Sequence, residues 1–164
     1  MSSTRWNAES AGDRNEHRAR QQVNSGGSVN QVAVSESSKV KSIEEAISRV
    51  ADGSSIMVGG FGLVGCPWPL IDALVEHGAR NLTIISNDLG SPGVGLGMLL
   101  TCGLVKKVIG TYYTWNPEVA QKYLKGDIEV ELVPQGTFVE RIRAAGVGLG
   151  GFYTPTAVGT DLAE

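Results

Sequence analysis

Two neutral amide side chains, Asn87 and Gln135, have the best positions for chemistry in this sequence. Asn87 directly follows the apolar run Leu82–Ser86, and Gln135 follows Glu129–Val133 after a single proline. A neutral amide can donate hydrogen bonds to a carboxylate or a thioester oxygen without adding charge. Because asparagine is also common in plain turns, a structural role for Asn87 stays open beside a functional one. Gln135, between a proline and a glycine, is less expected as a mere turn residue.

A glycine-rich segment, Gly59–Gly65, is a second candidate for a binding site. It consists of Gly59, Gly60, Phe61, Gly62, Leu63, Val64 and Gly65. Its G-x-G-x-x-G pattern, with Asp88 near the end of the next strand, is typical of dinucleotide binding. In such sites, however, the helix begins within the glycines and its amides face the pyrophosphate, whereas Pro67 and Pro69 remove two amides here. A dinucleotide site and a set of tight turns both remain open.

The sequence offers no conventional nucleophile. It contains no G-x-S-x-G motif and no Cys/His cluster with metal-ligand spacing, so no metal site is predicted. Cys66 is more often a small buried thiol than a reactive one. Glu118 and Glu140 fall in early helical turns, where the helix dipole favours acids. The aromatic residues that could either line a pocket or pack at strand ends are Tyr112, Tyr113 and Trp115.

The composition is that of one ordinary globular domain with an appendage. The chain has 164 residues and a formal net charge of −3, which argues against a basic nucleic-acid-binding face. No apolar run approaches the ~20 residues that span a bilayer. Two cysteines favour a reducing compartment, hence a cytoplasmic location. Residues 1–38 are rich in Ser, Asn, Gln and Arg, so we expect a disordered polar tail there and a folded domain over 39–164.

Helix and strand periods alternate from Lys39 onward. The expected helices cover 43–50, 67–78, 98–104, 117–125 and 137–145, and the expected strands cover 55–58, 82–86, 107–112 and 129–133. This alternation predicts an α/β fold with a mostly parallel sheet that is covered on both faces. Ligands bind outside the carboxyl ends of such strands. The rule selects four segments, namely Gly59–Gly65, 87–90, 113–116 and 134–136.

Over residues 39–164 the sequence resembles the A (alpha) subunits of family I CoA-transferases. The likeness begins with Asp52-Gly53-Ser54-Ser55-Ile56-Met57-Val58-Gly59-Gly60-Phe61, followed by Gly65 and Pro67. It continues through 82–90, 132–136 and 140–145, and ends with Gly151-Phe152-Tyr153-Thr154-Pro155-Thr156 and Gly159-Thr160. By pattern, the nearest groups are the 3-oxoacid, acetate and 3-oxoadipate CoA-transferases.

The resemblance implies a three-layer α/β/α fold and a ping-pong transfer of CoA. The donor would be an acyl-CoA such as succinyl-CoA, and the acceptor a carboxylic or 3-oxo acid such as acetoacetate. The nucleophilic glutamate would come from a B subunit in a hetero-oligomer, forming an acyl anhydride and then a CoA thioester. Gly59–Gly65 would bind CoA, while Asn87 and Gln135 would face the reacting carboxylate and thioester. Coenzyme A is then a substrate, and no permanently bound cofactor is implied.

The sequence departs from the family pattern in several places. Asp88 stands where many relatives have a second Asn, and Ala157 replaces a usual Gly. Cys66-Pro67-Trp68-Pro69 replaces the commoner Ile-Pro-Glu-Asn type of stretch. The chain ends at Glu164, whereas the family's A-type chains continue, so we expect a sheet that is incomplete at the C-terminus. The alternative functions are a nucleotide-binding (NAD-type) α/β domain and an inactive truncated remnant.

Overall fold

A computed structural model describes residues 40–161, in which helices and strands alternate as predicted. The helices are α2 (Ile43–Ile47), α3 (Trp68–His77), α4 (Leu96–Thr101), α5 (Pro117–Lys125) and α6 (Gln135–Gly146). The strands are β1 (Ser55–Met57), β2 (Leu82–Ile85), β3 (Val105–Gly110) and β4 (Glu129–Leu132). The polar tail predicted for residues 1–38 lies outside the described residues. Between residues 40 and 161, no helix combines the length and the apolar character needed to cross a bilayer.

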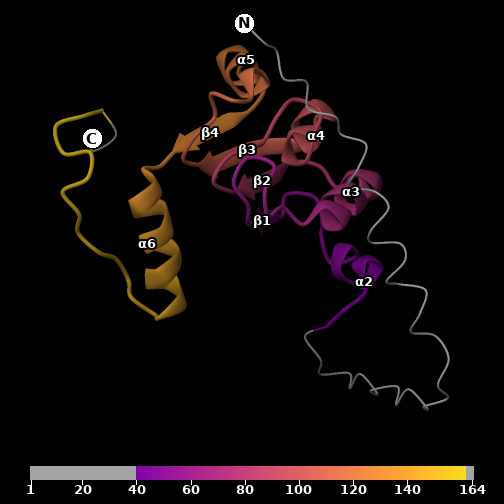
Figure 1. Ribbon diagram of the computed structural model, residues 1–164, viewed down its shortest axis with the longest axis horizontal. Coiled ribbons are helices and arrows are strands. Elements are labelled where there is room, and N and C mark those ends of the chain that lie inside the picture. The colour runs from indigo at the N-terminus through magenta and orange to yellow at the C-terminus, as the bar shows by residue number, and fades with distance from the viewer. Residues whose placement is uncertain (1–39, 162–164) are drawn as a thin grey trace, which may run out of the picture. The chain divides into compact units, whose positions relative to one another are not determined.

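The four strands form one parallel sheet in the order β1-β2-β3-β4 (Figure 1). In register, Ile56 lies beside Ile84, Ile84 beside Val108, and Val108 beside Val130. Because all strands run in the same direction, their carboxyl ends lie at one edge of the sheet. The segments that follow the four strands are therefore brought together there.

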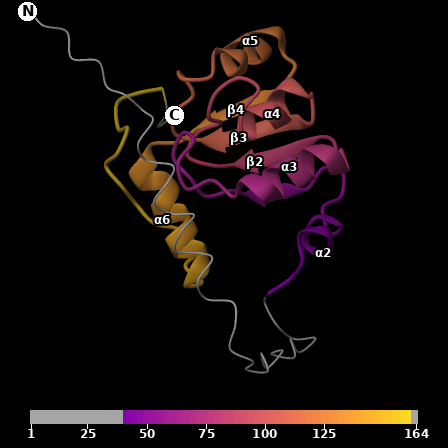
Figure 2. The same ribbon diagram turned by 45° about the vertical axis from the view of Figure 1, so that its right-hand side comes forward.

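Helices α3, α4 and α5 cover one face of the sheet (Figure 2). Right-handed crossovers between strands that are added in one direction place their connecting helices on the same side. Ile84 and Val108 of the strands and Leu99 and Leu100 of α4 are completely buried in the core between them. The core cluster comprises Ile71, Leu74, Ala79, Leu82, Ile84, Leu89, Leu96, Leu99, Leu100, Leu104, Val105, Val108, Val119 and Ile128.

Helix α6 follows β4 and lies on the opposite face of the sheet (Figures 1 and 2). Arg141 of α6 pairs with Glu131 of β4 at 2.8 Å. A small apolar cavity of about 190 Å³ lies between α6 and strands β1, β2 and β3, and it is lined by Met57, Ile85, Ile109, Phe138, Arg141, Ile142 and Ala145. The three-layer α/β/α class is thus confirmed, with a thinner second helix layer that leaves Met57 60% exposed.

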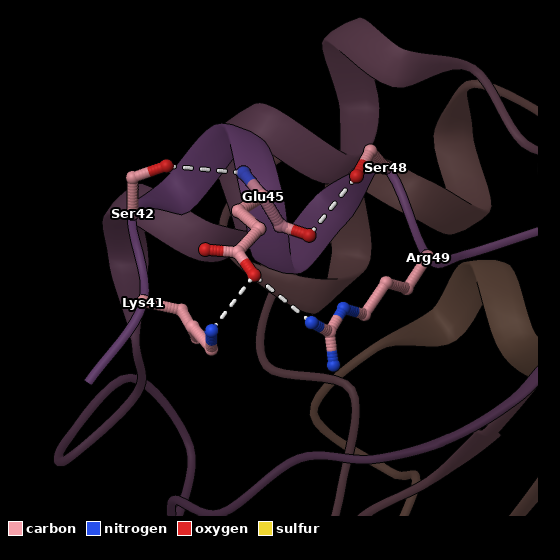
Figure 3. A network of polar contacts seen from close by, with 5 residues as sticks. All are labelled: Lys41, Ser42, Glu45, Ser48 and Arg49. Atoms are coloured by element: carbon pink, nitrogen blue, oxygen red, sulfur yellow. Dashed lines mark hydrogen bonds and ion pairs between the residues drawn. The ribbon is translucent and has the colours of Figure 1, made fainter. Parts of the chain in front are cut away.

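Helix α2 begins at the serine cap that the sequence predicts. Ser42 Oγ accepts a hydrogen bond from the Glu45 backbone N–H at 3.1 Å (Figure 3). In a full capping box the Glu side chain would reach back to the cap residue. Here the Glu45 carboxylate lies 3.0 Å from Lys41 Nζ and 2.9 Å from Arg49 Nη2 instead. The Ser48 hydroxyl donates to the Glu45 carbonyl at 3.0 Å, and the helix ends at Ile47, earlier than predicted.

Several other predicted boundaries also differ from the structure, and three of them bear on the site. Helix α4 ends at Thr101 rather than 104, because Gly103 adopts a left-handed φ of +70°. Strand β3 then begins at Val105, two residues earlier than predicted, because one apolar run spans both elements and hides their border. Helix α6 starts at Gln135 rather than at 137, which places Gln135 in its first turn.

Candidate active site

The carboxyl ends of the strands border an open cavity of about 380 Å³. The lining residues are Phe61, Asn87, Thr111, Tyr112, Trp115 and Gln135. Phe61 follows β1, Asn87 follows β2, the next three follow β3, and Gln135 follows β4. All four strand-end segments thus meet at one cavity, as expected for a parallel sheet.

Three aromatic rings form the apolar wall of this cavity. The Trp115 ring stands edge-on to Phe61 and to Tyr112, with centroid distances of 5.8 Å in both pairs. Phe61 remains 62% exposed and Trp115 54% exposed. The sequence left open whether Tyr112 and Trp115 line a pocket or pack, and the structure places both in the cavity lining.

Asn87 and Gln135, 48 residues apart in the sequence, are in direct contact. Asn87 Nδ2 donates to Gln135 Oε1 at 2.6 Å and to Thr111 Oγ1 at 2.9 Å. The Thr111 hydroxyl donates in turn to the Asn87 backbone carbonyl at 3.1 Å. Asn87 Oδ1 is buried and has no hydrogen-bond partner among the described residues. Sequence reasoning missed Thr111, whose only signal is its position directly after a strand.

Gln135 also lies at the positive end of a helix. It is the first residue of α6, and its cap residue Pro134 provides no side-chain hydrogen bond to the helix. The first backbone N–H groups of a helix have no intrahelical partner and carry partial positive charge. Among the residues that the structure describes, no Lys or Arg lines the cavity. The cavity therefore favours a carboxylate or a developing oxyanion through neutral donors and backbone dipoles.

The glycine-rich segment forms a tight turn at the rim of the cavity. Phe61 and Val64 exchange two backbone hydrogen bonds of 3.0 Å. Gly62 has a φ of +59°, and a Cβ added there would lie 2.8 Å from Trp115 Cζ3. Of the seven residues predicted to bind CoA, only Phe61 lines the cavity; the others are Gly59, Gly60, Gly62, Leu63, Val64 and Gly65. Their contact with CoA stays a prediction.

The Asp88 side chain connects this turn by hydrogen bonds to the loop that contains Gly90. Its carboxylate accepts hydrogen bonds of 2.7 Å from the backbone N–H groups of Gly62 and Gly90, one on each oxygen. The residue is only 5% exposed, so its carboxylate is not free to bind a ribose hydroxyl. Helix α3 also begins only at Trp68, beyond the glycines. The geometry of a dinucleotide site is therefore absent from this part of the chain.

Two titratable groups near Asp88 are held in their neutral forms. Burial, and secondly the charge of Asp88, raises the pKa of the Cys66 thiol. Its S–H group lies 3.5 Å from the Gly62 carbonyl, to which it donates. Burial first, then Asp88 and Glu131, raise the pKa of the Tyr113 hydroxyl. Since both groups keep their protons at neutral pH, neither is an activated nucleophile.

The two candidate glutamates do not reach the cavity. Glu118 accepts the Thr101 hydroxyl at 2.7 Å and lies 3.6 Å from Lys122 Nζ. Glu140 pairs with Arg143 at 2.6 Å, and hydrogen bonding from Arg143 lowers the pKa of Glu140. Within residues 40–161, no carboxylate lines the cavity. The same residues contain no group of three His, Cys, Asp or Glu side chains placed to hold a metal ion.

The protein is thus an α/β protein with a parallel sheet, and the neutral donors at its strand ends are of the kind that can bind a carboxylate or acyl oxygen. The chain belongs to the coenzyme A transferase family, which matches residues 40–164. It is 48% identical over 125 residues to the A subunit of a probable succinyl-CoA:3-ketoacid coenzyme A transferase from Mycobacterium bovis, covering 76% of this chain and 50% of that protein. It is 46% identical to the alpha subunit of the acetate CoA-transferase of Escherichia coli, covering 77% of this chain and 57% of that protein.

A solved structure shows the same fold. An acyl-CoA transferase of Escherichia coli, in a thioester complex with CoA, matches with a TM-score of 0.62 and 26% identity. The match covers 73% of this chain and 25% of that one. The chain spans about half the length of the curated relatives it matches.

Proposed function

We propose that this chain is part of the A subunit of a CoA-transferase, which moves CoA from an acyl-CoA to a carboxylic or 3-oxo acid. The observation that carries the proposal is the hydrogen-bonded pair Asn87–Gln135. It lines the same cavity as the aromatic wall, and Gln135 is the first residue of α6 at the positive end of that helix. The names of the relatives, a probable succinyl-CoA:3-ketoacid and an acetate CoA-transferase, support this reaction class.

The nucleophile comes from a partner. No carboxylate lines the cavity within the described residues, and the relatives are named as A or alpha subunits, which supports a second, B-type chain. A glutamate of that B-type partner attacks the thioester carbonyl, expels CoA as a thiolate and forms an acyl anhydride. The thiolate then attacks the glutamyl carbonyl of the anhydride, releases the first acid and leaves a glutamyl-CoA thioester. The second acid reverses these steps and leaves with CoA.

Each of these steps places negative charge on a carbonyl oxygen. A side-chain N–H of Gln135, aided by the dipole of α6, stabilises that oxyanion, and the aromatic wall keeps water away from it. Coenzyme A is a substrate in this scheme and not a resident cofactor. The rim turn Gly59–Gly65, which exposes Phe61 beside the cavity, is the proposed contact for CoA. The unpaired thiols of Cys66 and Cys102 support a cytoplasmic location.

The experiment purifies the chain alone and mixed with a candidate B subunit, then measures CoA transfer from succinyl-CoA to acetoacetate, acetate and 3-oxoadipate. We expect transfer only in the mixture, and protection of the mixture from unfolding by CoA but not by NAD. Comparable transfer by the isolated chain would place the nucleophile in this chain. If the mixture shows no CoA transfer, even after a family-like extension is joined after Glu164, the result would favour an inactive remnant.

A further inference from the structure

We propose that Tyr112 and Trp115 select acids and acyl-CoAs whose far end is uncharged. The far end is the end of the acyl chain opposite the reacting carboxylate or thioester. Monocarboxylic acids, with or without a 3-oxo group, are then preferred over dicarboxylic acids of the same length. This inference rests on the proposed function, because it names the substrate class of the same cavity.

Tyr112 is held next to the amide pair by the backbone. The backbone N–H groups of Thr111 and Tyr112 both donate to the Asn87 carbonyl, at 2.9 and 3.2 Å. The Asn87 side chain in turn donates to Gln135. A short acyl chain whose reacting oxygen binds Gln135 thus shares the cavity with the Tyr112 ring.

Trp115 continues this wall and is in contact on two sides. Its ring stands at 90° to the Tyr112 ring, with 5.8 Å between the centroids. At the rim, Gly62 leaves room for it, since a Cβ added at Gly62 would lie 2.8 Å from Trp115 Cζ3. Tyr112 is 46% exposed and Trp115 54% exposed, so both rings keep surface that a ligand can cover. A wall that is already formed needs little ordering when the ligand binds.

An aromatic wall treats a methyl group and a carboxylate very differently. A methyl or methylene group gains free energy when it leaves water and packs against the rings. A carboxylate in the same place loses its hydration and gains no cation in return. The Tyr112 hydroxyl and the Trp115 indole N–H are neutral donors, which suit the keto oxygen of a 3-oxo acid but replace only part of the hydration of an ion.

The cations of the described residues do not offset this cost. None of them lines the cavity. On neighbouring elements, Lys107 and Arg141 both pair with Glu131, at 3.1 and 2.8 Å. Lys122 of α5 lies 3.6 Å from Glu118. In this part of the chain, a second carboxylate in the cavity therefore has no side chain of opposite charge beside it.

The test uses the assembled enzyme and pairs of substrates that differ only at the far end. Butyryl-CoA and succinyl-CoA are compared as donors to acetoacetate, and 3-oxohexanoate and 3-oxoadipate as acceptors from butyryl-CoA. We expect kcat/KM to be about tenfold higher for the uncharged member of each pair. A ratio near one, or a preference for the dicarboxylic member, overturns the inference.

The wall itself is tested by Trp115→Arg, which places a cation in it. We expect the ratio to shift about tenfold toward succinyl-CoA and 3-oxoadipate, whereas Trp115→Leu, which stays apolar, retains the native preference. Tyr123→Arg on α5 is the matched control, because Tyr123 is also 54% exposed and does not line this cavity. If Trp115→Arg does not fold, Tyr112→Arg replaces it. An unchanged ratio in the folded variant overturns the inference, because the wall then does not contact the far end of the acyl group.

Failure of the proposed function gives a different result. An assembly that transfers CoA between none of these pairs counts against that function, and calorimetric binding of butyryl-CoA and succinyl-CoA to the same assembly then decides the inference. Tighter binding of butyryl-CoA supports the selection by the wall. Equal binding, tighter binding of succinyl-CoA, or binding of neither thioester overturns it.

Discussion

Asn87 and Asp88 are neighbours in the chain, yet their side chains serve two different regions. The Asp88 side chain turns inward, where its two oxygens accept hydrogen bonds from the backbone N–H groups of Gly62 and Gly90. We call these three residues the clamp. Asn87 turns to the cavity, where it contacts Thr111 and Gln135. Strand β2 ends at Ile85, so the short segment that follows one strand supplies both a residue that holds two loops together and a residue of the cavity.

The two regions differ in how completely their polar atoms are satisfied. Both oxygens of Asp88 have donors, whereas Asn87 Oδ1 is buried without a partner in the described residues. Satisfied buried groups stabilise a fold, whereas an unsatisfied buried group needs a specific explanation, such as a functional role. We therefore expect substitutions in the clamp to change stability and substitutions in the cavity to change turnover.

The largest effect is expected for Gln135→Ala. Removing one donor to an oxyanion typically lowers kcat by about 10²–10³-fold, or about 3–4 kcal/mol of barrier. Because Gln135 is exposed, the free energy of unfolding should hardly change. Steady-state kinetics of the assembled enzyme and urea unfolding of the chain test the two halves of this expectation. The exposed Gln121→Ala on α5 is the matched control, and near-normal turnover of folded Gln135→Ala would remove Gln135 from the chemistry.

The converse is expected for Asp88→Ala. Its loss leaves the buried N–H groups of Gly62 and Gly90 without an acceptor, which lowers the free energy of unfolding by about 3 kcal/mol. Asp88→Asn keeps one acceptor oxygen and should lose about half as much. Urea denaturation measures both, with the exposed Asp72→Ala on α3 as control. A native-like stability of Asp88→Ala would mean that the clamp does not hold the two loops.

Gly62→Ala is expected to lower the free energy of unfolding by a smaller amount. Gly62 belongs to the clamp and also lies against Trp115 of the cavity wall. A φ of +59° disfavours alanine, and the added Cβ would meet the Trp115 ring at 2.8 Å. Together these lower the free energy of unfolding by about 2 kcal/mol. Gly136→Ala is the matched control, since no atom lies within 4 Å of its added Cβ, and it should be neutral or slightly stabilising. Equal stability of both variants would contradict the strain at Gly62.

The hydrophobic periodicity of the sequence predicted the order of helices and strands better than it predicted where each of them begins and ends. Alternating apolar periods predicted the order of the elements and the parallel sheet, because these depend on which faces must be buried. They could not divide α4 from β3, since Leu99, Leu100, Leu104 and Val105 are all buried and show no change of period. The border depends on the left-handed turn at Gly103, which only the three-dimensional path requires.

The strand-end rule selected Asn87 and Gln135, and the structure brings them into contact. It could not find Thr111, because a threonine after a strand is unremarkable until its partner 24 residues away is known. The separate G-x-G-x-x-G pattern made Asp88 a candidate ribose ligand, because its hydrogen bond to Gly62 depends on packing between two loops and leaves no signal in the sequence. The roles of Asn87, Gln135 and the glycine-rich segment toward CoA stay predictions.

The smallest effect expected is a pH dependence that Asp88 shares with Tyr113. Burial and then the charge of Asp88 raise the pKa of Tyr113, so the folded chain keeps the phenol proton where the unfolded chain loses it. The resulting stability is fully present below the unfolded pKa of about 10, and it is lost as pH rises above that value toward the folded pKa.

We expect the free energy of unfolding to fall by about 1 kcal/mol more between pH 9 and pH 11 in the native chain than in Tyr113→Phe, since about one pKa unit is traversed above the unfolded value. Urea unfolding at several pH values measures this difference, and the common titration of lysines cancels in the comparison. Asp88→Asn should reduce the difference, because the charge of Asp88 is the second cause of the raised pKa. Parallel curves for the native chain and Tyr113→Phe would mean that the clamp side of the strand end is more open to water than its burial indicates. The contrast between a closed clamp and an open cavity would then be lost.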